Sequence, residues 1–322
     1  MNMQCAVPLF KTERPVAFGV GAYLRQKRHP ASWVQGLAAR LIVSLLMMGL
    51  VMPAGAESPG AADGVRAVER SRALSLASAE AVESQADRQY QALKREASEK
   101  RALAPDHHPQ LQRLRRIAKD IIVFAPRVNE RAASWRWEVN LIGSRQVNAF
   151  CMPGGKIAFF IGILETLKLS DDEVAMVMGH EIAHALLEHG RERVGKQRAA
   201  QALTFGASIA SQLLGFGDLG GHLASGAAQL TLLKYGRDDE TEADLVGMDI
   251  AARAGYDPRA SVSLWQKMKA LGKDQPPQWL STHPSHDRRI EEIRTHLKDV
   301  LPLYAQARGM SLDQLPPYAA AP

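Results

Sequence analysis

Cysteine is almost absent from this chain of 322 residues, which contains only Cys5 and Cys151. Export would remove Cys5 together with an N-terminal signal, and the remaining cysteine would then have no partner for an internal disulfide. We expect Cys151 in the hydrophobic core, and we expect stability to come from that core, with a bound metal as a further source. No lipid-attachment cysteine follows Ala56, which argues against a lipoprotein.

A long apolar run is lacking near the N-terminus. Residues 41–52 form an apolar stretch of about 12 residues, whereas a helix that spans a bilayer needs roughly 20. Basic residues ending at Arg40 precede this stretch, and a small-residue triplet ending at Ala56 follows it, which is the layout of an export signal. We therefore predict a signal peptide over residues 1–56 and a periplasmic protein, with a permanent membrane anchor as the less favoured alternative.

The body of the chain has little excess charge of either sign. The net charge is +6, but residues 1–56 contain six basic residues against Glu13 alone, a net of +5, so the remainder carries only +1. A nearly neutral body offers no basic surface for a polyanion. We therefore expect no nucleic-acid partner.

Large apolar residues are sparse over residues 57–104, where Ala, Ser, Glu, Arg and Gln predominate. That composition predicts a helical or partly disordered leader. The main domain is expected over residues 105–308, with a C-terminal tail over 309–322. Residues 199–233 are rich in Ala, Gly, Leu and Ser. We interpret them as buried or lid-like helices, with a membrane hairpin as the alternative.

Hydrophobic spacing predicts a mostly helical domain with one small sheet. Ser170 and Glu173 have the spacing of a capping box, which marks the start of a helix expected to run from residue 171 to 189. The expected strands cover 135–142, 147–151 and 156–164, and the other expected helices cover 111–122, 237–254, 259–271 and 286–300.

The run His180-Glu181-Ile182-Ala183-His184 lies on the first of these helices. Residues four apart share one helix face, so His180 and His184 can bind one cation at about 2 Å. Glu181 can face a water at that cation and accept its proton. The pattern specifies only three residues, but a capped helix after a small sheet is the setting such a site requires.

A catalytic zinc takes a third protein ligand, which has to come from elsewhere in the chain. Leu187 and Gly190 occupy the positions where a metzincin has Gly and His, so the ligand is not supplied there. Glu188 lies a turn further along the same helix and cannot complete a tetrahedron. His189 lies about 140° away from the metal face of a continuous helix, and we assign it no role.

Glu240 and Asp244 are four residues apart on a second expected helix. One can bind the metal while the other orients a histidine ligand from behind. Glu242 points to another face and is expected in solvent. The alternative is that the whole acidic cluster is a solvated helix start.

Several motifs, in this order, resemble those of the M48 family of metallopeptidases, and the resemblance covers about residues 106–300. They are Asn148-Ala149-Phe150 with Pro153-Gly154-Gly155, the HExxH of residues 180–184, Glu240 with Asp244, and Thr282-His283-Pro284 with Arg289. The chain is most similar to the soluble periplasmic branch that acts in quality control of the bacterial envelope.

The resemblance implies that Glu240 is the third ligand of one zinc ion and that Asp244 lies behind the ligands. It implies that His283 lies near the metal, as a regulatory fourth ligand or an oxyanion stabiliser, with Arg289 beside it. A purely structural contact is the alternative for His283 and Arg289. It also places the substrate along the strand that follows Asn148. The turn Pro153-Gly154-Gly155 is then part of the substrate site or, as the simpler interpretation, only a strand connection.

The sequence thus predicts an α+β, zincin-like fold, mostly helical with a small sheet beside the HExxH helix. The predicted activity is zinc-dependent endopeptidase hydrolysis of misfolded or unassembled envelope proteins, with Glu181, His283 and Arg289 as catalytic residues. The partners are polypeptide substrates, with peripheral contact to the envelope membrane or the outer-membrane assembly machinery left open. The alternatives are a metal-bound chaperone with little protease activity and a membrane-anchored M48 protease.

Overall fold

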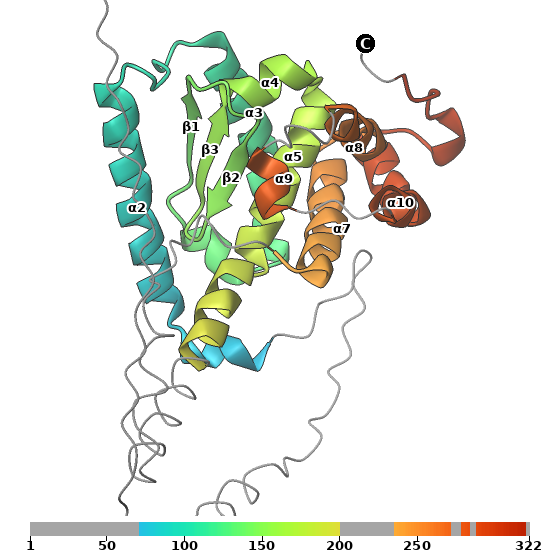
Figure 1. Ribbon diagram of the computed structural model, residues 1–322. Coiled ribbons are helices and arrows are strands. Elements are labelled where there is room, and N and C mark those ends of the chain that lie inside the picture. The colour runs from blue at the N-terminus through green and yellow to red at the C-terminus, as the bar shows by residue number, and fades with distance from the viewer. Residues whose placement is uncertain (1–70, 200–234, 272–277, 284–287, 320–322) are drawn as a thin grey trace, which may run out of the picture. The chain divides into compact units, whose positions relative to one another are not determined.

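Three strands, β1 (Glu138–Ile142), β2 (Ala149–Met152) and β3 (Lys156–Phe160), form one small mixed sheet (Figure 1). The structure is a computed structural model, and it describes residues 71–199, 235–271, 278–283 and 288–319. Strand β3 lies in the middle, parallel to β1 and antiparallel to β2. The third strand is shorter than predicted, because helix α4 (Ile161–Leu167) begins where it ends.

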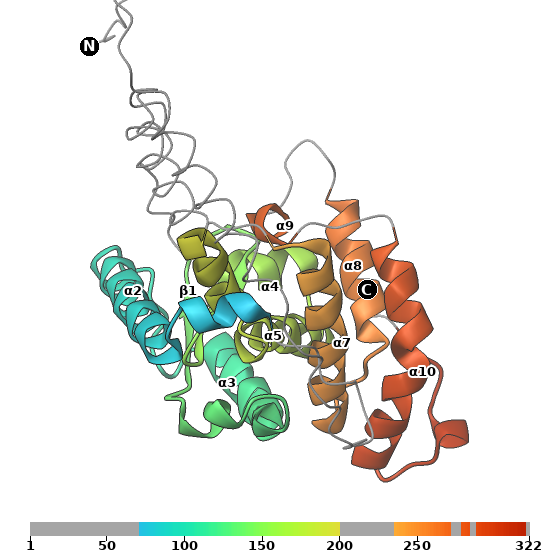
Figure 2. The ribbon, with the colours of Figure 1, turned by 90° about the horizontal axis from the view of Figure 1, so that it is seen from below.

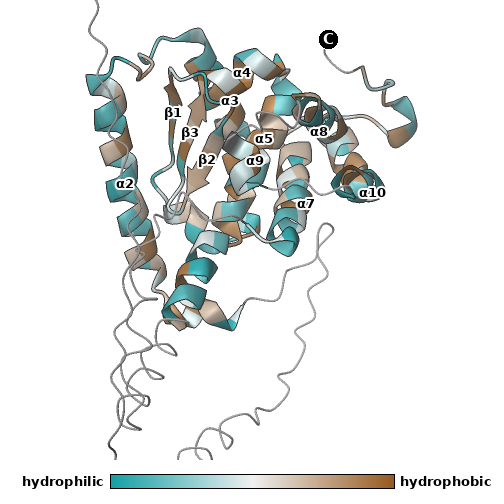
Figure 3. Ribbon diagram, viewed as in Figure 1, coloured by the Kyte–Doolittle hydropathy of each residue, from teal (hydrophilic) through white to brown (hydrophobic). Residues whose placement is uncertain are grey.

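Helices cover both faces of this sheet, which explains why every residue of β3 is buried. Ala158 and Phe160 cluster with Tyr90 of helix α2 (Ala79–Glu99) on one face. Ile157 and Phe159 point to the other face, toward helices α3 (Pro109–Ile122) and α5 (Asp171–Leu186). The strands are accordingly hydrophobic while α2 is largely hydrophilic (Figure 3).

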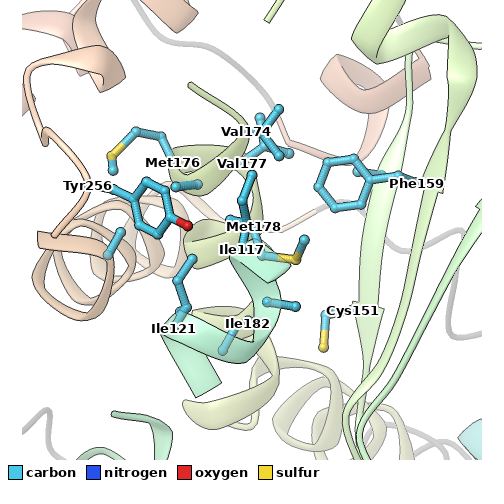
Figure 4. Packing of buried hydrophobic residues seen from close by; sticks show 14 of the residues in the cluster. Ile117, Ile121, Cys151, Phe159, Val174, Met176, Val177, Met178, Ile182 and Tyr256 are labelled. Atoms are coloured by element: carbon cyan, nitrogen blue, oxygen red, sulfur yellow. The ribbon is translucent and has the colours of Figure 1, made fainter. Parts of the chain in front are cut away.

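The main core lies between the sheet, α3 and α5. Val177 and Met178 of α5 lie beside Ile117 of α3 and near Phe159 of the central strand (Figure 4). Cys151 belongs to the same cluster and is buried, as predicted. This packing fixes α5, the helix with the HExxH run, against the sheet.

Helix α5 starts as predicted and ends earlier than predicted. The capping box forms: Glu173 N donates to Ser170 Oγ at 3.2 Å, and Ser170 N donates to Glu173 Oε2 at 2.9 Å. The helix was expected to continue to residue 189 but ends at Leu186. Glu188 adopts a left-handed backbone conformation, with φ +59°, and a separate helix covers residues 189–199.

Helix α7 (Arg237–Arg253) crosses α5 at two glycines. A Cβ atom on Gly179 would lie 2.6 Å from Gly247 O, and one on Gly247 would lie 2.7 Å from His180 N. Each glycine costs a helix about 1 kcal/mol relative to alanine, but here the lack of a side chain lets the two backbones touch. The crossing therefore places His180 directly against the acidic residues of α7.

Two further helices follow α7 as predicted, and a short one lies between them. Helix α7 lies between α5 and the last helix, α10 (Arg289–Ala307), when the molecule is seen from below (Figure 2). The last helix extends seven residues beyond the predicted end at residue 300, to Ala307. The remaining elements are α8 (Ala260–Ala270), α9 (Gln278–Thr282), α10 (Arg289–Ala307), and the 3-10 turns Arg72–Leu76, Ala125–Arg127, Glu130–Ser134 and Leu312–Gln314.

The predicted signal peptide and nearly all of the predicted lid, residues 200–233, lie outside the described residues. Among the helices of the described ranges, none combines the length and the hydropathy needed to cross a membrane. The mostly helical α+β architecture with a small sheet beside the HExxH helix agrees with the fold class expected from the sequence.

Candidate metal centre

Four side chains from three parts of the chain meet in the protein interior. His180 and His184 come from α5, Glu240 from α7, and His283 from the residue after α9; all four are buried, and one ligand atom of each lies within 4.8 Å of the others. The structure therefore brings the three predicted ligands together and adds His283 to them.

The distances within this group fit a single ion. His180 Nε2 lies 3.1 Å from His184 Nε2 and 3.6 Å from Glu240 Oε2. His184 Nε2 lies 3.5 Å from Glu240 Oε1. His283 Nδ1 lies 3.2 Å from His180 Nε2 and 3.1 Å from Glu240 Oε1. Ligands about 2.0–2.1 Å from a tetrahedral zinc ion are separated by roughly 3.4 Å, so the observed separations of 3.1 to 3.6 Å are close to those expected between ligands of one such ion.

The chemistry of the donor set points the same way. Without a cation, the lone pairs of imidazole nitrogens and a carboxylate would face one another away from water, which is costly. Burial on its own raises the pKa of Glu240, but the close contacts with His184, His283 and His180 outweigh it and hold that pKa well below its ordinary range. Glu240 is thus a carboxylate, the form that binds a metal.

Asp244 supports His180 from behind, as predicted for a residue that orients a ligand. Its Oδ1 lies 2.9 Å from His180 Nδ1, the ring nitrogen that faces away from the other ligands. Burial raises the pKa of Asp244, but the charge of Arg289 and the hydrogen bond with His180 outweigh it and hold the pKa below its usual value. The carboxylate therefore fixes the orientation of the ring and the position of its proton.

Arg289 occupies a different place from the one predicted. Its Nε and Nη2 donate to Asp244 at 2.6 and 2.8 Å, and its Nη1 donates to Glu240 Oε2 at 2.5 Å. The guanidinium also stacks over the ring of Trp265, 3.7 Å from its centroid. This geometry does not support the prediction that Arg289 is a catalytic residue and agrees with the alternative of a structural contact, because these contacts hold it behind the ligands, where it neutralises the two carboxylates.

His283 Nδ1 faces His180 and Glu240, and its Nε2 lies 3.5 Å from Oε1 of Glu181, the predicted base. Of the two roles that the resemblance implied, this geometry fits the fourth ligand better than the oxyanion stabiliser. A fourth protein ligand closes the position that a catalytic zinc keeps open for water.

Trp279 of α9 contacts Glu181, and sequence reasoning missed it. Its indole Nε1 donates to Glu181 Oε1 at 2.5 Å, and its ring stacks on that of His283 with the centroids 5.0 Å apart. The spacing could have revealed it, because Trp279 precedes His283 by four residues and His283 N donates to Trp279 O at 2.8 Å. The same short segment therefore contacts Glu181, the predicted base, and supplies His283 to the group of candidate ligands.

Three residues around His184 were also missed, and two of them had been set aside. His189 Nδ1 lies 2.9 Å from His184 Nδ1, and His189 Nε2 lies 3.2 Å from Glu242 Oε2. His189 is not among the four grouped side chains, but it does contact His184 from behind, because α5 ends before Glu188 and the chain folds back. Glu242, which was expected in solvent, is only partly exposed and contacts His189. Tyr235 stacks on His184 at 3.8 Å between centroids, and no sequence pattern marked it.

The predicted substrate residues lie at the two ends of strand β2. Asn148 O accepts a hydrogen bond from Phe160 N at 3.1 Å. Pro153-Gly154-Gly155 form the turn into β3, with φ +84° and +78° at the glycines, and a Cβ atom on Gly155 would lie 2.7 Å from the Trp137 ring. The simpler interpretation, that Pro153-Gly154-Gly155 connects β2 to β3, is therefore sufficient to explain this turn. Strand β2 itself is the outer strand of the sheet on the side that contacts α5.

Comparisons with known proteins extend this picture. The family model described as Peptidase family M48 matches residues 108–297. Mitochondrial metalloendopeptidase OMA1 of Schizosaccharomyces pombe is 34% identical over 202 residues, 61% of this chain and 56% of that protein. The protein of the same name from Arabidopsis thaliana is 40% identical over 176 residues, 54% of this chain and 34% of that protein. Beta-barrel assembly-enhancing protease of Escherichia coli is 30% identical over 178 residues, 52% of this chain and 36% of that protein. The chain thus matches between 34% and 56% of the length of these relatives.

Proposed function

The chain belongs to peptidase family M48, and we propose that it is a zinc-dependent metalloendopeptidase. The observation that carries this proposal is the convergence of His180, His184 and Glu240 at the spacing of zinc ligands, with Glu181 adjacent to them. The three relatives described above are named as metalloendopeptidases or as a protease, which supports the same activity.

The ligands and the base divide the chemistry between them. His180, His184 and Glu240 would hold the zinc ion, which when bound supplies the Lewis acidity that polarises a carbonyl and acidifies water. Glu181 would accept a proton from the attacking water and deliver it to the leaving amine. Arg289 and Asp244 act from behind: they keep Glu240 and His180 in place and touch no reacting atom.

His283 is proposed as the ligand that keeps the enzyme at rest. With His283 Nδ1 at the fourth corner and Trp279 bonded to Glu181, neither the water position nor the base is available. Movement of this one segment would release both. The described conformation therefore corresponds to a closed state, and activation requires residues 279–283 to leave the site.

The substrates are proposed to be misfolded or unassembled polypeptides of the bacterial envelope. An extended peptide could add to the outer edge of β2 through backbone hydrogen bonds that are indifferent to side chains, near Asn148 and the Pro153-Gly154-Gly155 turn. The export layout of residues 1–56 supports a periplasmic location. The beta-barrel assembly-enhancing relative suggests contact with outer-membrane assembly machinery, whereas other relatives are named mitochondrial.

Casein cleavage by the zinc-loaded full chain tests this proposal. Glu181→Gln should lower the rate by about 10²- to 10⁴-fold, because it removes the base, while zinc content stays unchanged. Glu165→Gln, an exposed glutamate on α4, is the matched control and should cleave at the wild-type rate. His283→Ala should cleave faster than wild type.

Two outcomes would count against the proposal. Absence of bound zinc in the wild-type protein would exclude the proposed site. Zinc binding without cleavage, even in His283→Ala, would favour the alternative of a metal-bound chaperone. That alternative is otherwise less well supported, because the relatives are named for proteolysis.

A further inference from the structure

The two metal histidines receive different support on the ring nitrogen that faces away from the ligand group. His180 Nδ1 contacts a carboxylate directly, at 2.9 Å from Asp244 Oδ1. His184 Nδ1 instead contacts another histidine, at 2.9 Å from His189 Nδ1. His189 is only 2% exposed, so water cannot take the place of this contact.

His184, His189 and Glu242 form a series of hydrogen-bonded side chains. The positions of the protons in this series follow from the proposed metal site. His184 Nε2 faces the ligand group and must offer a lone pair there, so the proton of its neutral ring lies on Nδ1. That N–H can only be accepted by a lone pair on His189 Nδ1. His189 then carries its own proton on Nε2 and donates it to Glu242 Oε2 at 3.2 Å. Every donor meets an acceptor.

The backbone is bent to make this contact possible. On a continuous helix His189 would lie far around from His184, but Glu188 is left-handed with φ +59°. A non-glycine residue in this conformation costs about 1–2 kcal/mol, so the surrounding structure has to hold it. Asn129 Nδ2 donates to Leu186 O at 2.8 Å, and Arg191 Nη1 donates to Glu188 Oε1 at 2.8 Å. Both sides of the strained turn are thus fixed.

We propose that His189 and Glu242 form a positioning pair for the metal ligand His184. The pair holds the imidazole in the tautomer and orientation that present Nε2 to the ion, and the carboxylate charge, passed through His189, makes that nitrogen a stronger ligand. This inference rests on the proposed metal site. Neither residue touches the reacting atoms.

A purely structural role is the competing explanation. His189 connects the end of α5 to α7 through Glu242, so its loss could simply loosen the fold. The two explanations differ in what has to be preserved at position 189. A structural role needs a side chain that fills the space, whereas a positioning role needs a hydrogen-bond acceptor at the place of Nδ1.

The test compares His189→Leu with His189→Asn in the full chain. Leucine fills the space and has no acceptor, while the asparagine Oδ1 can take the place of Nδ1. We expect His189→Leu to lower the zinc affinity by about 10- to 100-fold in chelator competition, and His189→Asn to keep most of it. Glu242→Gln should give a smaller loss. Asp238→Asn, which neutralises an exposed carboxylate in the first turn of α7, is the control and should bind as wild type.

Two readouts separate the explanations. The visible absorption of the Co²⁺-substituted protein should change in His189→Leu and resemble wild type in His189→Asn, because it reports the geometry at the ion. In urea unfolding of the metal-free proteins, His189→Asn, the variant with the higher zinc affinity, should not also have the higher free energy of unfolding. Equal zinc affinity in wild type and His189→Leu, or equal loss in both variants, would overturn the inference while leaving the metal site intact. If the wild type binds no zinc, the proposed function itself fails.

Discussion

In the candidate metal centre, His180 and His184 are both held from behind by a hydrogen-bonded side chain, but the supporting residues differ. His180 is backed by Asp244, whose charge is balanced by a guanidinium that is only 1% exposed, that of Arg289. His184 is backed by His189 and then by Glu242, whose side chain is 31% exposed. One side is a closed ion-pair network, and the other is a hydrogen-bonded chain that ends at the surface.

The two kinds of support should respond differently to substitution. A buried carboxylate pair needs its cation, because an uncompensated charge in the interior is costly. A chain that ends in solvent can lose its last member without leaving a buried charge. We therefore expect changes on the His180 side to affect folding and changes on the His184 side to affect mainly the metal.

The largest effect should come from Arg289→Met. It leaves Asp244 and Glu240 buried without their cation, and we expect the free energy of unfolding of the metal-free protein to fall by about 3–5 kcal/mol. Glu242→Gln, on the other side, should cost less than about 1 kcal/mol because its carboxylate is partly in water. Urea denaturation measures both. Similar losses in the two variants would break the comparison.

Removal of the metal should come next in size. At a free zinc concentration 100 times the dissociation constant, binding stabilises the folded protein by about 2.7 kcal/mol. We expect chelation to increase amide hydrogen exchange more at residues 184–191 than at residues 240–247, because Arg289 keeps the second segment tied without the ion. Equal deprotection of the two segments would show that the ion supports both sides alike.

Asp244→Asn should lower zinc affinity by about 10- to 100-fold, because the Asp244 carboxylate contacts Nδ1 of the ligand His180 directly and fixes its orientation. The double variant with Glu242→Gln measures whether the two supports are independent. They act on different ligands, so the losses in binding free energy should add to within about 0.5 kcal/mol. A much smaller combined loss would mean that both supports act through one shared element.

The smallest effect concerns the strained turn, which is found only on the His184 side. Glu188→Gly should be more stable than Glu188→Ala by about 1 kcal/mol, because glycine adopts positive φ freely. Both variants lose the contact with Arg191, so that loss cancels. At Glu192, inside the helix of residues 189–199, the order should reverse by a similar amount. Thermal unfolding of the four variants tests this, and the same order at both positions would contradict the strain.

Features set by residues a few positions apart in the chain could be predicted from the sequence. The capping box at Ser170 formed as predicted, because it involves residues three apart. Helix α7 was predicted to within a residue of its observed end, and the shared face of Glu240 and Asp244 followed from that helix. The family prediction, made from motifs over residues 106–300, is confirmed by the match to residues 108–297.

Features that depend on where a helix ends, or on contacts between distant segments, could not be predicted in this way. The angular argument against His189 assumed a helix that continues, and no glycine at position 188 signalled the break. The choice between a catalytic and a structural role for Arg289 stayed open, because its partners, Asp244 and Glu240, are 45 and 49 residues away in the chain. Trp279 was missed although its spacing to His283 is regular.

The sequence by itself determined which residues make up the candidate site: two histidines four residues apart with a glutamate beside the first, an acidic pair on a second helix, and a capped start for the first helix. These depend on the fixed geometry of one helix turn. Only the tertiary structure decided what stands behind each ligand. The contact of Gly179 with Gly247 brought α7 to His180, and the left-handed Glu188 turned His189 back to His184. Such placements depend on how closely backbones pack, which no spacing along the chain records.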